Sequence, residues 1–208
     1  MGTRNLTVVV SGGKHRIAQY GQWDGYPHGQ GKTVLGFCKR HLSTKKGRQE
    51  FLAKLGNVQW ISAEQLSALW KAEGADDSGM VSMEVAEKFG SKYPQLSRDC
   101  GAEVLPLVRR SRGPVQLRDS IDFAGDSLFC EWAYVIDLDK GVLEVYVGFQ
   151  DKPIGRRERF ARYFKRQEHR KESQYWPIKL AKSYSLSRLP TARRFYADLQ
   201  QDEEEEAA

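Results

Sequence analysis

The first 23 residues contain two segments with the alternating side-chain pattern of β-strands. Residues 5–11 (NLTVVVS) and 15–23 (HRIAQYGQW) are rich in β-branched and aromatic residues. Gly12 and Gly13 stand between them, and two glycines between such runs are typical of a two-residue hairpin turn. The pattern predicts a β-hairpin over residues 5–23. Neither face of its second strand is wholly apolar, and a strand of this kind can border a cleft.

The middle of the chain changes to the apolar spacing of amphipathic helices. Helices are predicted over 33–43, over 47–55, from Ser62 onward, over 80–92 and over 101–111. The third has the clearest start, because Ser62 and Gln65 fit a capping box, and Ile61 with Leu66 fits a hydrophobic staple. Pro106 is expected to kink or shorten the last of these helices.

The alternating pattern returns after residue 127. Residues 128–138 and 142–149 predict a second hairpin around Asp139-Lys140-Gly141. They are followed by a basic helix over 155–171, a strand over 176–186 and a short helix over 190–200.

Strands and helices are thus segregated along the chain, which is typical of the α+β class. We expect an antiparallel sheet built from the two hairpins, about 5–23 and 128–149, and the late strand 176–186, packed by the helical middle segment. The interpretation is a single domain over 1–200 and a disordered acidic tail over 201–208.

Composition narrows the class of protein. No apolar run approaches the roughly 18 residues of a membrane span, and the start shows no signal-peptide pattern, so no membrane partner is expected. The three cysteines, Cys38, Cys100 and Cys130, are an odd number at wide spacings. This pattern favours free thiols in a reducing compartment, and therefore a cytoplasmic protein. No residues have the spacing of a metal site, and no cofactor is predicted.

The charge is unevenly distributed. The net charge is +6, and it rises to +11 when the five acids of Asp202–Glu206 are left out. Nine cations lie within residues 152–171, which we interpret as one face of the basic helix. The candidate polyanion-binding residues are Arg156, Arg159, Arg162, Lys165 and Arg166. The alternative is a solvated amphipathic helix whose acids pair locally with the cations.

The glycine-rich turn before the first helix is the densest mixture of aromatic, polar and glycine residues. It ends in Gly31-Lys32-Thr33, but a P-loop needs glycine five residues before Gly31, where Tyr26 stands. A helix N-terminus can still bind an anion without that motif. The candidate ligand-binding residues are Gln22, Trp23, Asp24, Tyr26, His28, Gln30 and Lys32. The alternative is a purely structural turn in which glycines provide positive φ.

Carboxylates offer a different chemistry. Asp24, Glu131 and Asp137, with Asp122 and Asp126 as further members, could converge if the two hairpins share a sheet. Paired carboxylates suit metal-assisted phosphodiester hydrolysis. The alternative is a structural ion pair across the sheet, with Arg4, Arg16 and Lys32 as candidate partners. An N-terminal nucleophile is not expected, since removal of Met1 would expose Gly2.

Three segments resemble a group of small uncharacterised proteins of bacteriophages and bacteria. They are MGTR at the start, IAQYGQWDGYPHGQG at 17–31 and DSLFCEWAYVIDLD at 126–139. The resemblance spans residues 1 to about 150 and implies one folded unit, a phage or bacterial setting and, for a phage protein, the host cytoplasm. It implies no reaction.

Three functions follow as hypotheses, and the sequence leaves open whether the protein is an enzyme. The first is a phage-type accessory protein, with counter-defence as one such role, that binds a nucleotide-like or other phosphorylated ligand through the turn 22–33. The second is a hydrolase or phosphodiesterase that uses Asp24, Glu131 and Asp137. The third is an inhibitor of a host protein, or a nucleic-acid binder, acting through the basic helix 156–171.

Overall fold

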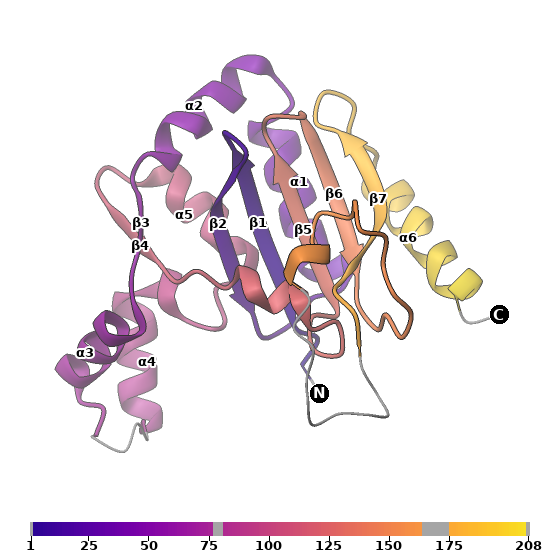
Figure 1. Ribbon diagram of the computed structural model, residues 1–208. Coiled ribbons are helices and arrows are strands. Elements are labelled where there is room, and N and C mark those ends of the chain that lie inside the picture. Colours follow the sequence, from indigo (N-terminus) through magenta and orange to yellow (C-terminus); the bar gives the residue numbers. More distant parts are fainter. Residues whose placement is uncertain (1, 77–80, 164–174, 207–208) are drawn as a thin grey trace.

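The computed structural model describes the backbone of residues 2–76, 81–163 and 175–206 (Figure 1). At its centre is a five-stranded sheet in the order β2-β1-β5-β6-β7. The strands are β1 (Asn5–Ser11), β2 (Lys14–Gly21), β5 (Trp132–Asp137), β6 (Val142–Val147) and β7 (Lys179–Ser185). Both predicted hairpins and the late strand are confirmed, and the protein belongs to the α+β class.

The two hairpins meet at the pair β1 and β5, which is parallel, whereas every other pair in this sheet is antiparallel. Asn5 lies opposite Trp132 and Val10 lies opposite Asp137. The N-terminal ends of β1 and β5 therefore share one end of the sheet. All residues of β1 and β5 are buried, as expected for central strands covered on both faces.

Four predicted strands, β2, β5, β6 and β7, are shorter than expected, and local hydrogen bonds explain where β2 ends and β5 begins. β2 ends at Gly21, so Trp23 lies outside the strand. The side-chain amide of Asn5 donates to the carbonyl oxygens of Gly21 and Trp23, which turns the chain away from the ladder. β5 begins at Trp132 instead of residue 128, because the amides of Phe129 and Cys130 donate to the carbonyl oxygen of Asp126 in a local turn.

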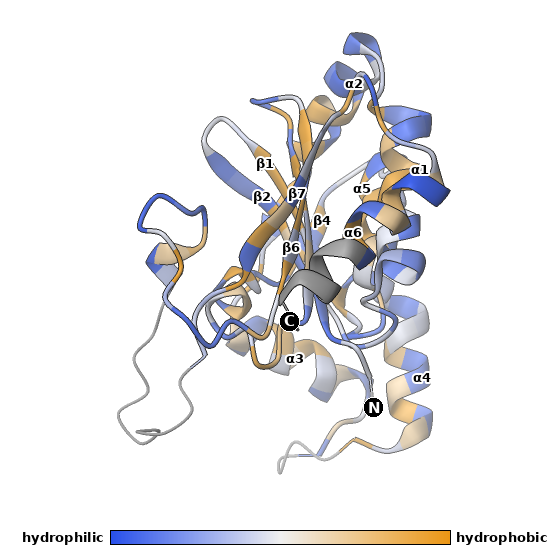
Figure 2. Cartoon of the chain, turned by 90° about the vertical axis from the view of Figure 1, so that its right-hand side faces the viewer, coloured by the Kyte–Doolittle hydropathy of each residue, from blue (hydrophilic) through white to orange (hydrophobic). Residues whose placement is uncertain are grey.

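Helices cover one face of the sheet, as Figure 2 shows from the side. They are α1 (Lys32–His41), α2 (Lys45–Leu55), α5 (Val104–Arg110) and α6 (Ala192–Glu206). Their apolar residues pack against the face of the sheet on which the side chains of Val9 and Ile136 lie. Pro106 lies in the first turn of the seven-residue α5, where it is tolerated, and the short helix η3 (Gly101–Glu103) precedes it. α6 extends into the acidic run, where the sequence predicts a disordered tail.

Irregular segments cover the other face. Leu6, Val8 and Val135 pack there against η4 (Ile121–Gly125) and against Phe160, next to η5 (Ala161–Tyr163). The described part of the chain has no helix long and apolar enough to cross a membrane.

The predicted basic helix is wrong over residues 155–163. This stretch consists of turns and the three-residue η5. Phe160 is buried and Tyr163 is half-buried, so the aromatic residues dock the segment as expected, but without a helix. Arg159 points inward to carboxylates of the sheet, while Arg156 and Arg162 are exposed. Lys165, Arg166 and the rest of the predicted helix lie outside the described residues.

A helical arm projects beside the β2 edge of the sheet, at the lower left of Figure 1. We define the arm as α3 (Ala63–Glu73) and α4 (Met83–Lys92), joined to the body through a small parallel sheet of β3 (Val58–Trp60) and β4 (Val115–Leu117). The capping box is confirmed, since the Gln65 amide donates to Ser62 Oγ and the Ser62 amide donates to Gln65 Oε1. Trp70 stacks on Phe89 across the two helices, at 3.6 Å between ring centroids. The short η2 (Pro94–Leu96) leads back to the body.

Candidate functional site

The glycine-rich turn is tied to the sheet by backbone hydrogen bonds. The Gly25 amide donates to the Thr3 carbonyl oxygen, and the buried Tyr134 hydroxyl donates to the Gly25 carbonyl oxygen at 2.7 Å. Asp24 adopts a φ of 55°, and its carbonyl oxygen accepts from the Gln30 amide at 2.7 Å. These contacts fix the turn as part of the scaffold.

The turn continues into the π-helix η1 (Pro27–Gly31), which runs directly into α1. The amides of Gly29 and Gly31 both donate to the Tyr26 carbonyl oxygen, and the Lys32 amide donates to the Gly29 carbonyl oxygen. These N–H groups are therefore already used within the protein. The anion cradle that the sequence predicts at the start of the helix has no free donor at these positions.

Two of the predicted ligand-binding side chains, Gln22 and Gln30, form hydrogen bonds within the protein. Gln30 donates to the Trp23 carbonyl oxygen and accepts from the Ala102 amide, while Gln22 accepts from the Tyr20 hydroxyl. Tyr26 and His28 do come together, stacked at 5.3 Å between ring centroids. The side chains of Trp23, Asp24, Tyr26, His28 and Lys32 are exposed. The turn thus presents an aromatic surface, not a pocket.

The three predicted catalytic carboxylates do not converge. Glu131 precedes β5 and Asp137 ends it, so six residues of extended chain hold them about 20 Å apart. Glu131 accepts from the Arg4 backbone amide at 3.2 Å, while the Arg4 guanidinium lies over the Phe129 ring. Among the described residues, no group of three or more His, Cys, Asp or Glu side chains is arranged to hold a metal ion.

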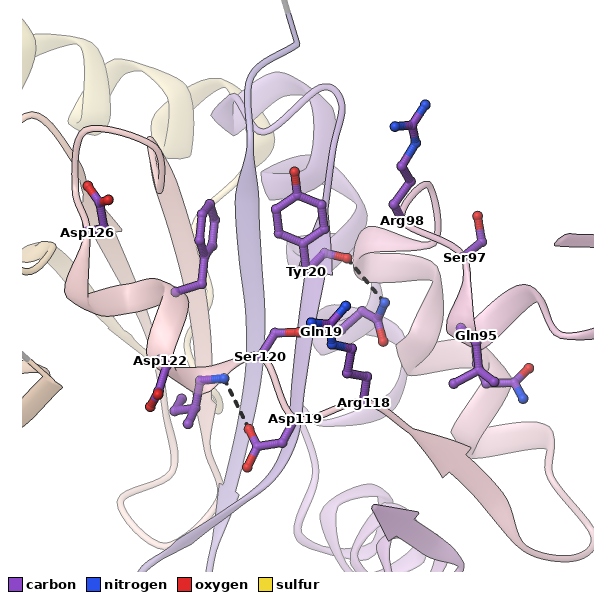
Figure 3. Close-up of a pocket in the computed structure, with 13 residues that line it drawn as sticks. Gln19, Tyr20, Gln95, Ser97, Arg98, Arg118, Asp119, Ser120, Asp122 and Asp126 are labelled. Carbon is purple, nitrogen blue, oxygen red and sulfur yellow. Dashed lines mark hydrogen bonds between the residues drawn. The ribbon is translucent and has the colours of Figure 1, made fainter. Parts of the chain in front are cut away.

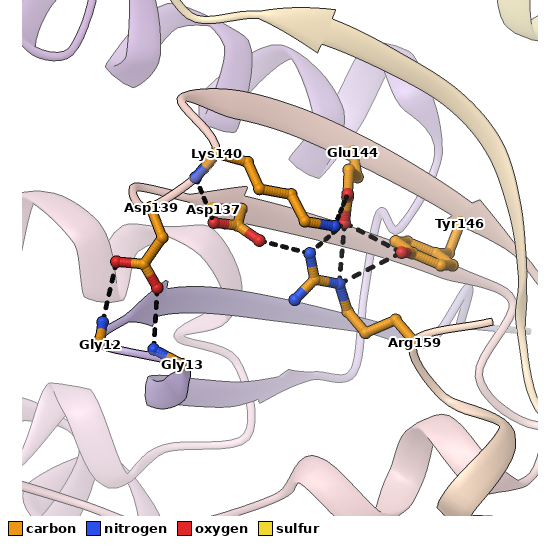
Figure 4. A network of polar contacts seen from close by, with 8 residues as sticks. All are labelled: Gly12, Gly13, Asp137, Asp139, Lys140, Glu144, Tyr146 and Arg159. Carbon is orange, nitrogen blue, oxygen red and sulfur yellow. Dashed lines mark hydrogen bonds and ion pairs between the residues drawn. The ribbon is translucent and has the colours of Figure 1, made fainter. Parts of the chain in front are cut away.

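Asp137 instead belongs to a polar network on the loop-covered face of the sheet (Figure 4). Arg159 reaches into this face and pairs with Asp137 and with Glu144, the latter at 2.7 Å. Tyr146 donates its hydroxyl to Glu144 at 2.9 Å. Burial lowers the pKa of Arg159, but the hydrogen bond to Asp137 and the charge of Glu144 outweigh it and raise that pKa overall. The structural ion pair is therefore present, with Arg159 as its cation.

A neighbouring carboxylate links the tips of the two hairpins. Asp139 accepts from the amides of Gly12 and Gly13, both at 2.9 Å, and these bonds lower its pKa. A lowered pKa in the folded state adds stability above the unfolded value near pH 4, and this stability is lost as the pH falls through the folded pKa.

We therefore expect Asp139→Asn to lower the free energy of unfolding by up to about 1 kcal/mol at pH 7, because Asp139 is exposed. The deficit relative to the unmodified protein should shrink as the pH falls below about 4. Urea unfolding at pH 7 and pH 3 measures both, with the exposed Asp151→Asn as the control. A deficit that stays the same at both pH values would contradict this role of the carboxylate.

A cleft lies on the outer side of β2, between the sheet edge and the segments that connect the arm to the body (Figure 3). Its volume is about 770 Å³. The residues that line it are Gln19, Tyr20, Gln95, Leu96, Ser97, Arg98, Arg118, Asp119, Ser120, Ile121, Asp122, Phe123 and Asp126. The prediction that the second strand borders a cleft is confirmed. Asp122 and Asp126 are among the carboxylates predicted from the sequence, whereas Arg98 and Arg118 lie in no motif that could have predicted them.

The charges of this cleft are separated in space. Figure 3 shows Arg98 and Arg118 on the arm side of β2, and Asp122 and Asp126 on the opposite side. Asp119 accepts from His15 Nε2 at 2.8 Å through one oxygen and from the Ile121 amide at 3.0 Å through the other. Within the described part of the chain, neither arginine forms an ion pair with an aspartate that lines the cleft, but Arg98 lies 3.9 Å from its chain neighbour Asp99. The arm side of the cleft is therefore positive.

Gln19 and Tyr20 of β2 line the cleft between the arginines on one side and the aspartates on the other. Tyr20 packs edge-on against Phe123 at 5.0 Å, and burial raises the pKa of Tyr20 while the charges of Arg4 and Arg98 lower it. Gln19 is buried and donates its Nε2 to the Tyr20 carbonyl oxygen, which fixes the orientation of the amide. Its Oε1 is buried without a hydrogen-bond partner in the protein. Such an unpaired buried oxygen costs stability.

Fold and cleft define the protein as an α+β protein with a polar cleft between a mixed sheet and a helical arm. The chain matches no protein-family model, and neither the curated proteins nor the solved structures gave a match. The resemblance to uncharacterised phage and bacterial proteins stays a prediction.

Proposed function

We propose that the protein binds a small phosphorylated molecule, such as a nucleotide, in the cleft beside β2. The pair Arg98 and Arg118 carries this proposal, because two guanidinium groups that line one cleft suit a phosphate. Arg98 is also 3.9 Å from the carboxylate of Asp99, a weak and exposed ion pair that a phosphate can replace. The two arginines come from two different segments of the cleft wall, one after η2 and one directly after β4. The fold therefore brings together two cations that lie 20 residues apart in the sequence.

The rest of the cleft suits the remainder of such a ligand. Tyr20 and Phe123 offer aromatic surface. Asp122 and Asp126, on the other side, suit hydroxyl or amino groups. The proposal keeps the ligand class that the sequence predicts and moves the site from the turn 22–33 to the cleft. With it we propose the phage accessory role, with counter-defence as one form, that the resemblance implies.

A thermal-shift screen with inorganic phosphate, sugar phosphates, nucleotides and dinucleotides at about 150 mM salt tests the proposal. A ligand at 100-fold over its dissociation constant should stabilise the protein by about 2.7 kcal/mol. Arg118→Ala should weaken binding by about 10- to 100-fold, because hydrogen bonds to charged groups contribute about 1.5–3 kcal/mol. Arg112→Ala removes the same charge from an exposed position outside the cleft and should leave binding unchanged.

Two outcomes contradict the proposal. One is the absence of any shift with all of these compounds. The other is equal weakening by Arg118→Ala and Arg112→Ala, which would indicate general attraction to a basic protein.

A further inference from the structure

A second, apolar groove lies on the arm and has a volume of about 310 Å³. Its apolar lining consists of Ala63, Leu66 and Trp70 of α3, Ala75, and Val81 ahead of α4. The polar residues of the lining are Ser67, Lys71, Asp76 and Arg118. Val81 is 38% exposed, and Leu66 and Trp70 are half-buried. The stack of Trp70 on Phe89 holds one face of the groove in a fixed position.

Arg118 is common to this groove and to the cleft beside β2. It directly follows β4, which joins the arm to the body. Arg118 therefore lines both hollows, and Figure 3 shows it on the arm side of the cleft. A ligand whose anionic group pairs with Arg118 has the apolar groove immediately beyond that group.

We propose that the ligand is amphipathic, with an apolar substituent that lies in the groove of the arm while its phosphate lies between Arg98 and Arg118. This inference rests on the proposed function and specifies the ligand as a phosphate ester of an apolar group. The main observation behind this inference is that Arg118 lines both the cleft and the groove. The apolar lining carries the rest, because Ala63, Leu66 and Val81 offer no partner for a polar group but exclude water from a hydrocarbon chain.

Calorimetric titration with butyl phosphate and octyl phosphate tests the inference. A fully buried methylene raises affinity about fourfold, since it contributes about 0.8 kcal/mol. With partial burial of the four extra methylenes, we expect octyl phosphate to bind at least about 10-fold more tightly than butyl phosphate.

The double variant Ala63→Asn/Val81→Asn places two neutral polar side chains in the groove at exposed positions that the fold should tolerate. It should reduce the preference for octyl phosphate to less than about threefold and leave the affinity for butyl phosphate unchanged. Met83→Asn is the matched control, because Met83 is 80% exposed on the same arm and does not line the groove. It should keep the full preference, and circular dichroism checks that both variants fold.

The outcomes separate this inference from the proposed function. If nucleotides or butyl phosphate bind and octyl phosphate binds no more tightly than butyl phosphate, the inference is overturned and the proposed function stands. An equal loss of the preference in Met83→Asn also overturns it, because the effect would then not be located in the groove. If no phosphate compound binds, the proposed function fails and the inference fails with it.

Discussion

Replacement of Arg159 by methionine is expected to lower the free energy of unfolding by about 3 kcal/mol or more. Asp137 and Glu144 are 2% and 5% exposed, and Arg159 is the cation that pairs with both. Methionine keeps much of the side-chain length but leaves two buried carboxylates facing each other without that cation. Urea unfolding at pH 7 measures the loss.

Two further variants make this prediction specific. Arg162→Met removes an exposed arginine that lies over the Tyr163 ring, and it should cost less than about 1 kcal/mol. Adding Asp137→Asn and Glu144→Gln to Arg159→Met removes both negative charges and should recover part of the lost stability. Equal effects of Arg159→Met and Arg162→Met, or no recovery in the triple variant, would contradict a buried ion network.

The second large effect is expected at the turn, where Gly31→Ala should lower the free energy of unfolding by about 1–3 kcal/mol. A Cβ atom at Gly31 would lie 2.7 Å from the Tyr134 hydroxyl oxygen. Tyr134 is fully buried, and its hydroxyl is bonded to the Gly25 carbonyl oxygen, so the ring has no free space to move into. Thermal and urea unfolding both report this loss.

Gly36→Ala is the matched control, five residues later in α1. A Cβ atom at Gly36 would lie 3.8 Å from Arg40 Nη2, which is an ordinary van der Waals contact. Alanine is the better helix former, so this variant should gain about 0.5–1 kcal/mol. The opposite signs of the two variants are the key result. A Gly31→Ala variant as stable as Gly36→Ala would show that the turn does not depend on close packing against Tyr134.

The hairpins, the helical middle and the α+β class could be predicted from the sequence because each depends on local periodicity. The capping box at Ser62 is equally local, and both of its hydrogen bonds are present. The parallel pairing of β1 with β5 could not be predicted, since no local pattern records which two hairpin strands become neighbours. It is this pairing that separates Glu131 from Asp137.

The basic helix shows how long-range contacts override composition. Residues 155–163 have many cations and aromatic residues at helical spacing, but Arg159 pairs with Asp137, 22 residues earlier. Buried carboxylates on the sheet therefore determine the conformation of this segment. Pro153 and Gly155 also disfavour a helix start here.

The candidate site could be predicted only in part. The mixed polarity of residues 15–23 indicated a cleft beside this strand, and Gln19 and Tyr20 do line it. Arg98 and Arg118 stand in loops without a motif, and the fold alone brings them to one cleft. The turn 22–33 has the stronger sequence pattern, but its glycines and glutamines make contacts that stabilise the scaffold.

The location of the ligand is tested most directly by backbone amide chemical shifts, measured by NMR during titration with adenosine 5′-monophosphate and with octyl phosphate. The proposal predicts saturable shifts at Gln95–Arg98 and Arg118–Phe123, with the turn Trp23–Lys32 little changed. Shifts confined to Trp23–Lys32 would return the site to the turn, and no shifts at either segment with both compounds would contradict phosphate binding in the cleft.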